Sequence, residues 1–216
     1  MSKIFIVGGA GKVARPLAAK LVERGHMPFS LYRNPEQREA LEALGTTPVL
    51  GDLAELSAAE LAGLMQGSDV VVFSAGAGGA GMEITNAIDG RGLEKSVEAA
   101  QIAGVKRFLL VSAFPDARRD AERKAGFENY IRVKKLADAY LVASGLDYVI
   151  LRPATLTNEP GTGKVKADLA IPYGTVPRED VAAVLAELVD HPQVSRIIIE
   201  LTQGDTPIPE AISALP

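Results

Sequence analysis

Seven short apolar runs, separated by longer stretches with helical periodicity, constrain the fold of this chain more than any other feature. Several runs, such as residues 69–73 and 107–111, are apolar on consecutive residues instead of on alternate ones. Strands buried on both faces have this pattern, because helices cover both sides of a parallel sheet. The sequence therefore predicts a doubly wound α/β fold with a mostly parallel sheet. The predicted strands, about seven in number, are residues 4–7, 28–32, 47–50, 69–73, 107–111, 148–151 and 196–201.

The segments between these strands have the apolar spacing of amphipathic helices that cover both faces of the sheet. A chain of 216 residues is long enough to bury a full core. No Ser- or Gly-rich linker interrupts the alternation, so residues 1–216 are expected to form a single Rossmann domain. The predicted helices are residues 36–44, 57–66, 85–103, 128–144 and 178–190.

Two stretches depart from this alternation. Residues 112–127 contain a charge run that includes Arg118, Arg119 and Arg123, which indicates a solvated loop or a short exposed helix. Residues 153–177 are rich in proline and glycine and follow the sixth predicted strand. A long loop inside a compact domain is often functional, and the carboxyl edge of an open α/β sheet is where ligands bind. We therefore expect residues 153–177 to form a substrate-side loop.

Composition excludes several classes of protein. Apolar residues make up 47% and charged residues 23% of the chain, which is typical of an ordered globular protein. A formal net charge of −4 argues against a general nucleic-acid or membrane-surface binder. There is no cysteine and only two histidines, His26 and His191, which excludes thiolate sites and argues against a histidine metal cluster. Neither a secretory leader nor a membrane-spanning run is visible, so we expect a cytoplasmic protein with no metal.

A glycine-rich turn follows the first predicted strand and opens a helix. It fits G-x-x-G-x-x-A from Gly8 or G-x-G-x-x-A from Gly9, and both patterns share Gly11 and Ala14. Glycines let the backbone approach a pyrophosphate closely, and the first helical turn offers unpaired amides to the anion. A phosphate-binding P-loop is excluded, because Ile6 stands where its first glycine belongs. The turn predicts a dinucleotide site built from Gly8, Gly9, Ala10, Gly11, Lys12 and Val13.

The end of the second strand favours NADPH over NADH. An NAD site usually has an acidic residue here that binds the ribose 2′-hydroxyl, but no acid occurs before Glu36. Arg33 instead offers a guanidinium that suits a 2′-phosphate, and Lys12 can assist from the glycine turn. The predicted cofactor is therefore NADP(H).

Further motifs along nearly the whole chain resemble the short-chain dehydrogenase/reductase superfamily, and more narrowly its atypical NmrA-like and flavin-reductase-like branch. Together these motifs are specific for the superfamily and much less specific for a substrate. They are Gly8-Gly9-Ala10-Gly11, Gly51-Asp52-Leu53, Phe73-Ser74-Ala75-Gly76, Ala103-Gly104-Val105-Lys106-Arg107-Phe108, Val111-Ser112, Tyr130-x-x-x-Lys134, Ser144-Gly145-Leu146-Asp147-Tyr148 and Leu151-Arg152-Pro153.

The resemblance implies roles for particular residues. Tyr130 would be the acid/base, and Lys134 would lower the tyrosine pKa and bind the nicotinamide ribose. Residues four apart share one helix face, so this spacing is also physically sensible. Around the cofactor, Asp52 and Leu53 would contact the adenine, and Ser74, Ala75 and Gly76 would line the cofactor path.

The hydrogen-bonding serine of the family has two candidate positions here. Depending on the strand register, the residue that faces the site is Ser112 or Ala113, because side chains alternate between the two faces of a strand. If Ala113 faces the site, activity is reduced or altered. The catalytic set predicted from the sequence is Tyr130, Lys134 and Ser112.

Two functions of different classes fit these features. The first is an NADPH-dependent reductase of a small carbonyl, quinone or flavin-type acceptor. The second is an NmrA-like regulatory protein that senses the dinucleotide and signals through a partner without turnover. Tyr130 and Lys134 favour the enzyme, whereas the uncertain serine favours the sensor. Little chain follows residue 152, so a small or flat acceptor fits better than a nucleotide sugar. The sequence leaves open whether the chain is a monomer or a dimer.

Overall fold

A nine-stranded sheet crosses the computed structural model, which describes residues 1–115 and 124–216. Its strand order is β11-β8-β10-β6-β5-β4-β1-β2-β3. The strands from β3 to β10 pair in parallel, and all seven predicted strands are found among them. These strands are β1 (Lys3–Val7), β2 (Met27–Tyr32), β3 (Thr47–Leu50), β4 (Val70–Phe73), β5 (Arg107–Val111), β6 (Asp147–Pro153) and β10 (Ile197–Gln203).

The order of the strands reverses next to β1. β1 pairs with β2 on one side and with β4 on the other, with Ile4 opposite both Pro28 and Val70. The chain therefore leaves β1 toward one edge of the sheet and returns to build the other. Ligands of open α/β sheets bind at such a reversal, outside the carboxyl ends of the strands.

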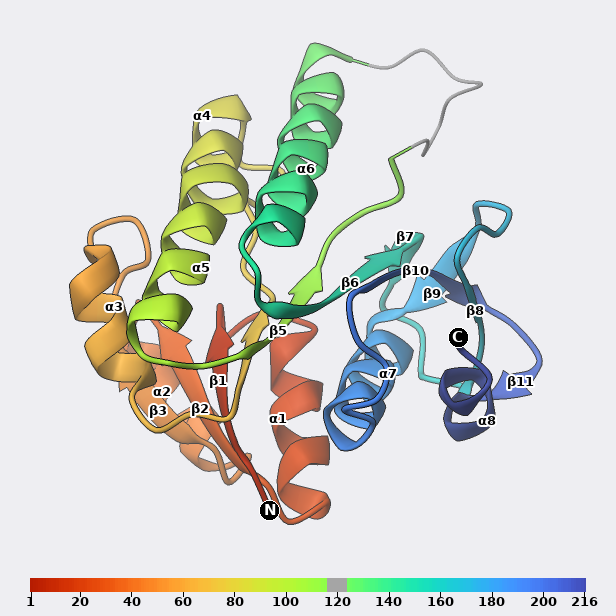
Figure 1. Ribbon diagram of the computed structural model, residues 1–216, viewed down its shortest axis with the longest axis horizontal. Coiled ribbons are helices and arrows are strands. Elements are labelled where there is room, and N and C mark those ends of the chain that lie inside the picture. The colour runs from red at the N-terminus through yellow and green to blue at the C-terminus, as the bar shows by residue number, and fades with distance from the viewer. Residues whose placement is uncertain (116–123) are drawn as a thin grey trace.

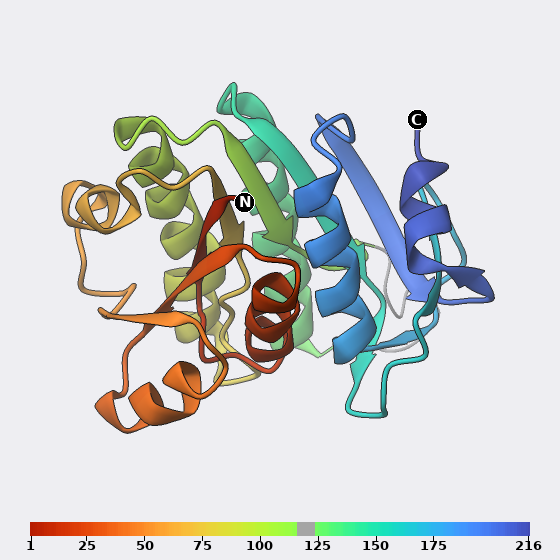
Figure 2. The same cartoon turned by 90° about the horizontal axis from the view of Figure 1, so that it is seen from below.

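Helices cover both faces of the sheet (Figures 1 and 2). On β1, Ile4 and Ile6 belong to the apolar cluster of α1, α7 and α8, whereas Phe5 and Val7 belong to that of α3, α5 and α6. Both faces of this strand are fully buried, which explains its consecutive apolar residues. The covering helices are α1 (Ala14–Glu23), α7 (Arg178–Asp190) and α8 (Ile208–Ser213), and opposite them α3 (Ala58–Met65), α5 (Leu93–Ile102) and α6 (Ala125–Ala143).

The predicted doubly wound fold is confirmed, but the count of about seven strands was too low. Two of the missed strands, β8 (Lys164–Asp168) and β11 (Thr206–Pro207), add antiparallel pairs to one edge of the sheet. β8 alternates buried or half-buried Val165 and Ala167 with exposed lysines, which is the pattern of a strand with one buried face. Residues 153–177 are therefore not a continuous loop. They also contain β7 (Thr155–Thr157) and β9 (Thr175–Pro177), which form a separate two-stranded parallel sheet.

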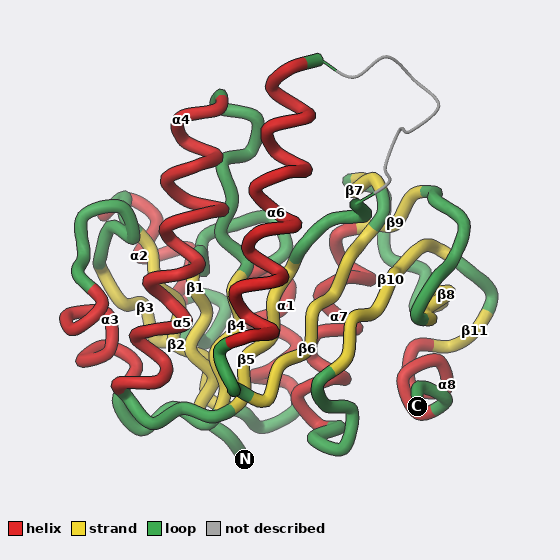
Figure 3. Tube along the Cα trace, turned by 45° about the horizontal axis from the view of Figure 1, so that its top comes forward, coloured by secondary structure: helices red, strands yellow, loops and turns green. Residues whose placement is uncertain are grey.

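The remaining helices are short and irregular. The predicted helix at 36–44 is a 3₁₀ turn, η1 (Pro35–Gln37), followed by α2 (Arg38–Glu42). The predicted helix at 85–103 begins with α4 (Met82–Thr85) and continues through a π-helical segment, η2 (Asn86–Gly92), into α5. π-Helical segments are rare and occur frequently at functional sites. Figure 3 shows α2 and α4 among the other helices, in red, and the strands, in yellow.

Two further predictions concern the charge run and the absence of a membrane-spanning segment. The charge run at 118–123 lies outside the described residues. None of the described helices combines the length and the hydrophobicity of a membrane span.

Candidate functional site

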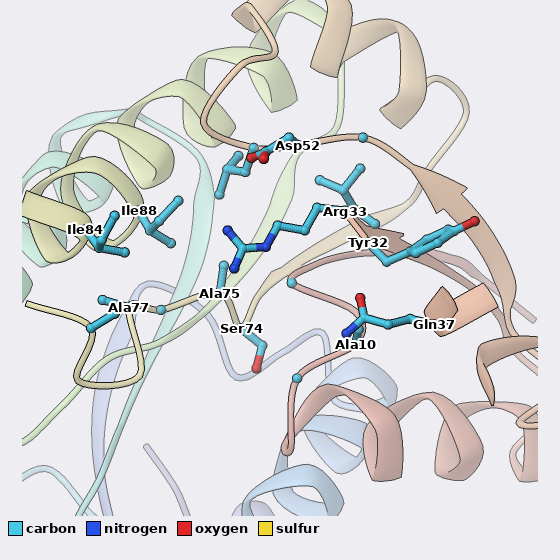
Figure 4. Close-up of a pocket in the computed structure, with 17 residues that line it drawn as sticks. Ala10, Tyr32, Arg33, Gln37, Asp52, Ser74, Ala75, Ala77, Ile84 and Ile88 are labelled. Carbon is cyan, nitrogen blue, oxygen red and sulfur yellow. The ribbon is translucent and has the colours of Figure 1, made fainter. Parts of the chain in front are cut away.

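A pocket of about 440 Å³ lies where the strand order reverses. The chain segments that follow β1, β2, β3 and β4 meet there, and α4 and η2 close one side. We call it the first pocket (Figure 4). Its lining residues are Gly8, Ala10, Gly11, Leu31, Tyr32, Arg33, Gln37, Gly51, Asp52, Leu53, Ser74, Ala75, Gly76, Ala77, Ala80, Ile84 and Ile88.

The glycine turn is shaped by close backbone contacts. Gly8 has a φ of +80°, and a Cβ atom on it would lie 2.6 Å from the Ala75 Cα. A Cβ on Gly9 would lie 2.4 Å from the Ser30 Cβ, and one on Gly11 would lie 3.0 Å from the Gly8 carbonyl oxygen. Gly8 therefore lets the turn approach the chain after β4, and Gly9 lets it approach β2.

The same turn presents unpaired donors. The backbone amides of Gly9 and Gly11 donate to Leu31 and Gly8. The amides of Ala10, Lys12 and Val13 have no hydrogen-bond partner within residues 1–115 and 124–216. Amides at the start of a helix that lack partners are suited to an anion such as a pyrophosphate. The turn therefore fits the diphosphate of a dinucleotide.

Most of the predicted cofactor residues line the first pocket, and four do not. Gly9 is packed against β2, the Lys12 side chain is exposed, Val13 is in the core, and Lys134 is buried elsewhere. Lys12 and Val13 are thus near the pocket only through their amides. The predicted residues that line it are Gly8, Ala10, Gly11, Arg33, Asp52, Leu53, Ser74, Ala75 and Gly76.

Arg33 points into the first pocket, between Asp52 and Ala75 in Figure 4. Within the described part of the chain, Arg33 and Asp52 are its only charged lining residues, and Glu36 is not among them. The Asp52 carboxylate accepts a hydrogen bond from the Ala54 amide at 2.8 Å, which orders the turn after β3. Arg33 is thus a cation of this pocket that has no ion-pair partner among the described residues.

Two supporting residues were missed by the sequence reasoning. Lys95 on α5 donates to the carbonyl oxygens of Leu53 at 2.8 Å and Ala54 at 3.2 Å. Asp89 on η2 accepts the Ala77 amide at 2.9 Å. Both side chains hold loops that line the first pocket. Nothing in the sequence marks Lys95. The only sequence signal for Asp89 is its place in a predicted helix interrupted by glycines, and the structure adds that its carboxylate is buried, which is unusual for an acid.

A second pocket of about 320 Å³ follows β5 and β6. β5 is the neighbour of β4, so both pockets open along the carboxyl edge of the parallel strands. Aromatic rings form much of its wall: Phe114 and Tyr173 meet edge-on with centroids 5.3 Å apart, and the Phe127 and Tyr130 centroids are 6.2 Å apart. Its lining residues are Ser112, Ala113, Phe114, Phe127, Tyr130, Ile131, Pro153, Ala154, Thr155, Leu156, Tyr173 and Arg178.

Ser112 and Ala113 both line this pocket, but the Ser112 hydroxyl is engaged. Its Oγ donates to the Asp138 Oδ1 at 2.6 Å. The other carboxylate oxygen of Asp138 accepts from the Arg152 guanidinium at 2.9 Å and 2.8 Å. Burial raises the pKa of Asp138, and the hydrogen bonds from Ser112 and Arg152 oppose that rise. Ser112, Asp138 and Arg152 thus form a buried network beneath the second pocket.

Lys134 is also engaged, and it lines neither pocket. Its Nζ donates to the Val111 carbonyl oxygen at 2.9 Å and lies 3.5 Å from the Asp89 Oδ1. Both side chains of this ion pair are less than 5% exposed. Asp89 therefore connects Lys134 to the loop that lines the first pocket.

The expected effect of Lys134 on Tyr130 is not found. Burial raises the pKa of Tyr130 above its usual range, and the carboxylates of Asp89 and Asp138 raise it further. Lys134 is paired with Asp89, and the pKa of Tyr130 is raised instead of lowered. The phenol of Tyr130 is therefore held in its protonated form.

No group of three His, Asp or Glu side chains in the described residues has the arrangement of a metal site.

Comparison with known proteins supports the dinucleotide site. The pattern of a family described as NAD(P)H-binding matches residues 8–192. The "Uncharacterized sugar epimerase YhfK" of Bacillus subtilis is 39% identical over 215 residues, which are 99% of this chain and 100% of the relative.

Two solved structures share the fold over nearly the full length. A Bacillus halodurans protein named as an NAD-dependent epimerase/dehydratase has a TM-score of 0.91 and 36% identity, with 99% of each chain covered. The oxidoreductase YlbE of Lactococcus lactis has a TM-score of 0.84 and 29% identity, and the match covers 98% of this chain and 95% of that one. The chain therefore belongs to the NAD(P)H-binding family, and its resemblance to the atypical short-chain dehydrogenases/reductases is confirmed.

Proposed function

We propose that this protein is an NADPH-dependent oxidoreductase that reduces a small, flat acceptor of the quinone or flavin type. The observation that carries this proposal is the second pocket, whose aromatic walls adjoin the dinucleotide site along one edge of the sheet. Such walls suit a planar conjugated ring, because aromatic rings stack in offset or edge-on arrangements.

The residues of the first pocket fit a phosphorylated dinucleotide. The amides of Ala10, Lys12 and Val13 would receive the diphosphate, and Arg33 would pair with the 2′-phosphate. Asp52 and Leu53 would contact the adenine. When bound, the reduced nicotinamide supplies the hydride, which together with one proton from solvent converts a quinone to a hydroquinone.

The state of Tyr130 favours such an acceptor over a simple carbonyl. Reduction of a simple carbonyl forms an alkoxide that needs a proton donor of matched pKa. Tyr130 has a raised pKa, so it is a poor acid, and its hydroxyl keeps the proton with which it can donate a hydrogen bond. A reduced quinone or flavin spreads its negative charge over a conjugated system and takes its proton from water. Tyr130 then orients the acceptor, while Ser112 and Lys134 keep the wall of the pocket in place.

The epimerase names of two relatives suggest a different substrate, a sugar. A sugar nucleotide carries many hydroxyl groups, and each loses its hydrogen bonds to water on binding. This loss costs free energy unless the site provides a hydrogen-bond partner. The second pocket offers few such partners: the Ser112 hydroxyl is bonded to Asp138, and the Thr155 hydroxyl is 2.6 Å from that of Tyr173. The geometry therefore favours a flat acceptor over a sugar.

Engagement of the predicted catalytic groups also supports a second candidate, a dinucleotide sensor without turnover. Lys134 is neutralised by Asp89 and Ser112 is bonded to Asp138, so neither is free to act on a substrate. A sensor needs the first pocket but no acceptor. The two candidates therefore differ in turnover and agree in cofactor binding.

Oxidation of NADPH with a panel of quinones, flavins and aldehydes tests the proposal. We expect turnover with quinones or flavins, weak turnover with aldehydes, and none in a Gly11→Val variant. NADPH binding without turnover by any member of the panel would favour the sensor. Failure to bind NADPH in a calorimetric titration would contradict both candidates.

A further inference from the structure

Among the residues that the structure describes, the second pocket has one charged lining residue, Arg178. We propose that the acceptor carries an anionic group, a carboxylate or a phosphate, which Arg178 binds while the conjugated ring lies among the aromatic side chains. This inference rests on the proposed function and adds to it the charge of the substrate.

Arg178 is held in place without being neutralised. It is the first residue of α7, and its Nη1 donates to the Leu156 carbonyl oxygen at 3.2 Å and to the Asn158 Oδ1 at 2.8 Å. Both acceptors are uncharged. Its Nε and Nη2 have no hydrogen-bond partner, and the guanidinium has no ion-pair partner, in the described residues. The Nε–H and Nη2–H, which together form one bidentate edge of the guanidinium, thus stay available, and carboxylate and phosphate groups bind to such an edge.

The acids next to Arg178 are occupied by other groups. The Glu179 carboxylate accepts the Gly161 amide at 2.9 Å and lies 3.7 Å from the Lys20 ammonium. The buried Asp180 carboxylate accepts the amides of Thr162 and Gly163 at 3.0 Å and 2.9 Å. These bonds fix the segment after β7 to the start of α7. Neither carboxylate forms an ion pair with Arg178 within residues 1–115 and 124–216.

The surroundings strengthen attraction of an anion to Arg178. The other described residues that line the pocket are uncharged, and Phe114, Ile131 and Ala154 are buried. An ionic hydrogen bond beside apolar walls is screened less than one in water. The start of α7 adds the positive end of a helix dipole. A flat ring between Phe114 and Tyr130 with an anionic substituent toward Arg178 would satisfy both parts of the pocket.

A binding experiment with matched ligands tests this inference. The protein is saturated with NADP⁺, so that no hydride is available and the first pocket is filled. FMN is then compared with riboflavin, which has the same ring without the phosphate, and naphthoate with the uncharged naphthylmethanol. Calorimetry gives the Kd of each ligand for the wild type, Arg178→Gln and a control, Arg132→Gln. Arg132 lies on α6, is exposed and does not line the pocket.

In the wild type we expect the anionic member of at least one pair to bind about 10- to 100-fold more tightly, the range for a charge-assisted hydrogen bond. Tighter binding of FMN than of riboflavin would indicate a phosphate site, and tighter binding of naphthoate than of naphthylmethanol would indicate a carboxylate site. Arg178→Gln should remove the difference and leave the neutral ligands unaffected, Arg178→Lys should restore part of it, and Arg132→Gln should keep it. Equal binding of both members of each pair, a difference that survives in Arg178→Gln, or no binding of any ligand would overturn the inference.

Turnover separates this inference from the proposed function. If riboflavin and FMN are reduced equally well and Arg178→Gln changes neither rate, the reductase stands and the anion site fails. If anionic ligands bind through Arg178 but nothing is reduced, the anion site stands and the reductase fails. A melting temperature of Arg178→Gln close to that of the wild type shows that loss of binding is not loss of folding.

Discussion

The two pockets differ in how far their polar groups are already used. In the first pocket, three amides of the glycine turn and the Arg33 guanidinium have no partner in the described residues. Around the second pocket, Ser112 and Lys134 are each engaged with a buried carboxylate. The first pocket therefore has free hydrogen-bond donors for a negatively charged ligand. The other is a shaped, mostly apolar space above a closed network of charges.

This difference separates cofactor binding from chemistry. Groups that lack protein partners are available to a ligand, because they exchange a hydrogen bond to water for one to the ligand without breaking a bond within the protein. Groups in a closed buried network stabilise the protein and give shape to the site, and they are costly to recruit for proton transfer. Substitutions in the first pocket should therefore affect affinity, and substitutions beneath the second should affect stability.

The largest expected effect is on stability, in Asp138→Ala. The substitution leaves the Arg152 guanidinium without its carboxylate and removes the acceptor of Ser112. Breaking a buried pair from one side costs about 3–5 kcal/mol. Chemical denaturation should show a fall of that size in the free energy of unfolding. Glu42→Ala, which breaks the exposed pair with Arg38, is the control and should change little. A small effect of Asp138→Ala would contradict the description of a closed network.

The same contrast explains which parts could be predicted from the sequence. The glycine turn is a local feature: Gly8, Gly9 and Gly11 lie within four positions, and their requirement for glycine depends on nearby backbone. The roles of Ser112 and Lys134 depend on Asp138 and Asp89, which are 26 and 45 positions away. A spacing such as Tyr130-x-x-x-Lys134 places two side chains on one helix face but does not say which charges from other elements face them.

Residues 153–177 teach the same lesson for the fold. Proline and glycine suggested a loop, yet Lys164–Asp168 forms β8 because it pairs with β10. This partner lies more than thirty residues further along the chain, so the local sequence does not reveal the pairing. The alternating Lys164-Val165-Lys166-Ala167 was a visible sign of a strand with one buried face. The parallel pair of β7 and β9 left no such sign, since each strand has only three residues.

The next largest effect should be on cofactor affinity, in Gly11→Val. A Cβ on Gly11 lies 3.0 Å from the Gly8 carbonyl oxygen, and the valine methyl groups extend further from this turn. We expect NADPH to bind roughly 100-fold more weakly, or about 3 kcal/mol. Calorimetry measures the affinity, and circular dichroism checks that the variant is folded. A folded variant with unchanged affinity would mean that the turn is only structural.

A smaller effect is expected on cofactor choice, in Arg33→Ala. Arg33 is the only cation among the described residues that line the first pocket. Its loss should therefore weaken the binding of NADPH by about 1.5–3 kcal/mol and leave the binding of NADH nearly unchanged. Both affinities are measured in the same buffer at low and high salt, and the preference for NADPH should shrink as salt rises. Lys135→Ala is the control, because that side chain on α6 is exposed and does not line the pocket. Equal affinities in the wild type would contradict an NADP(H) site.

The smallest effect on turnover should come from Tyr130→Phe. If Tyr130 only orients a quinone or flavin, its loss should lower kcat less than about 10-fold, whereas loss of a true general acid costs roughly 10²–10⁴. Its raised pKa gives a second measurement. Above about pH 10 an unfolded tyrosine releases its proton while the folded Tyr130 keeps it, so the folded state binds more protons and stability falls as pH rises. The free energy of unfolding should therefore decline more steeply above pH 10 in the wild type than in Tyr130→Phe. Identical slopes, or a loss of kcat beyond about 100-fold, would return Tyr130 to the role of proton donor.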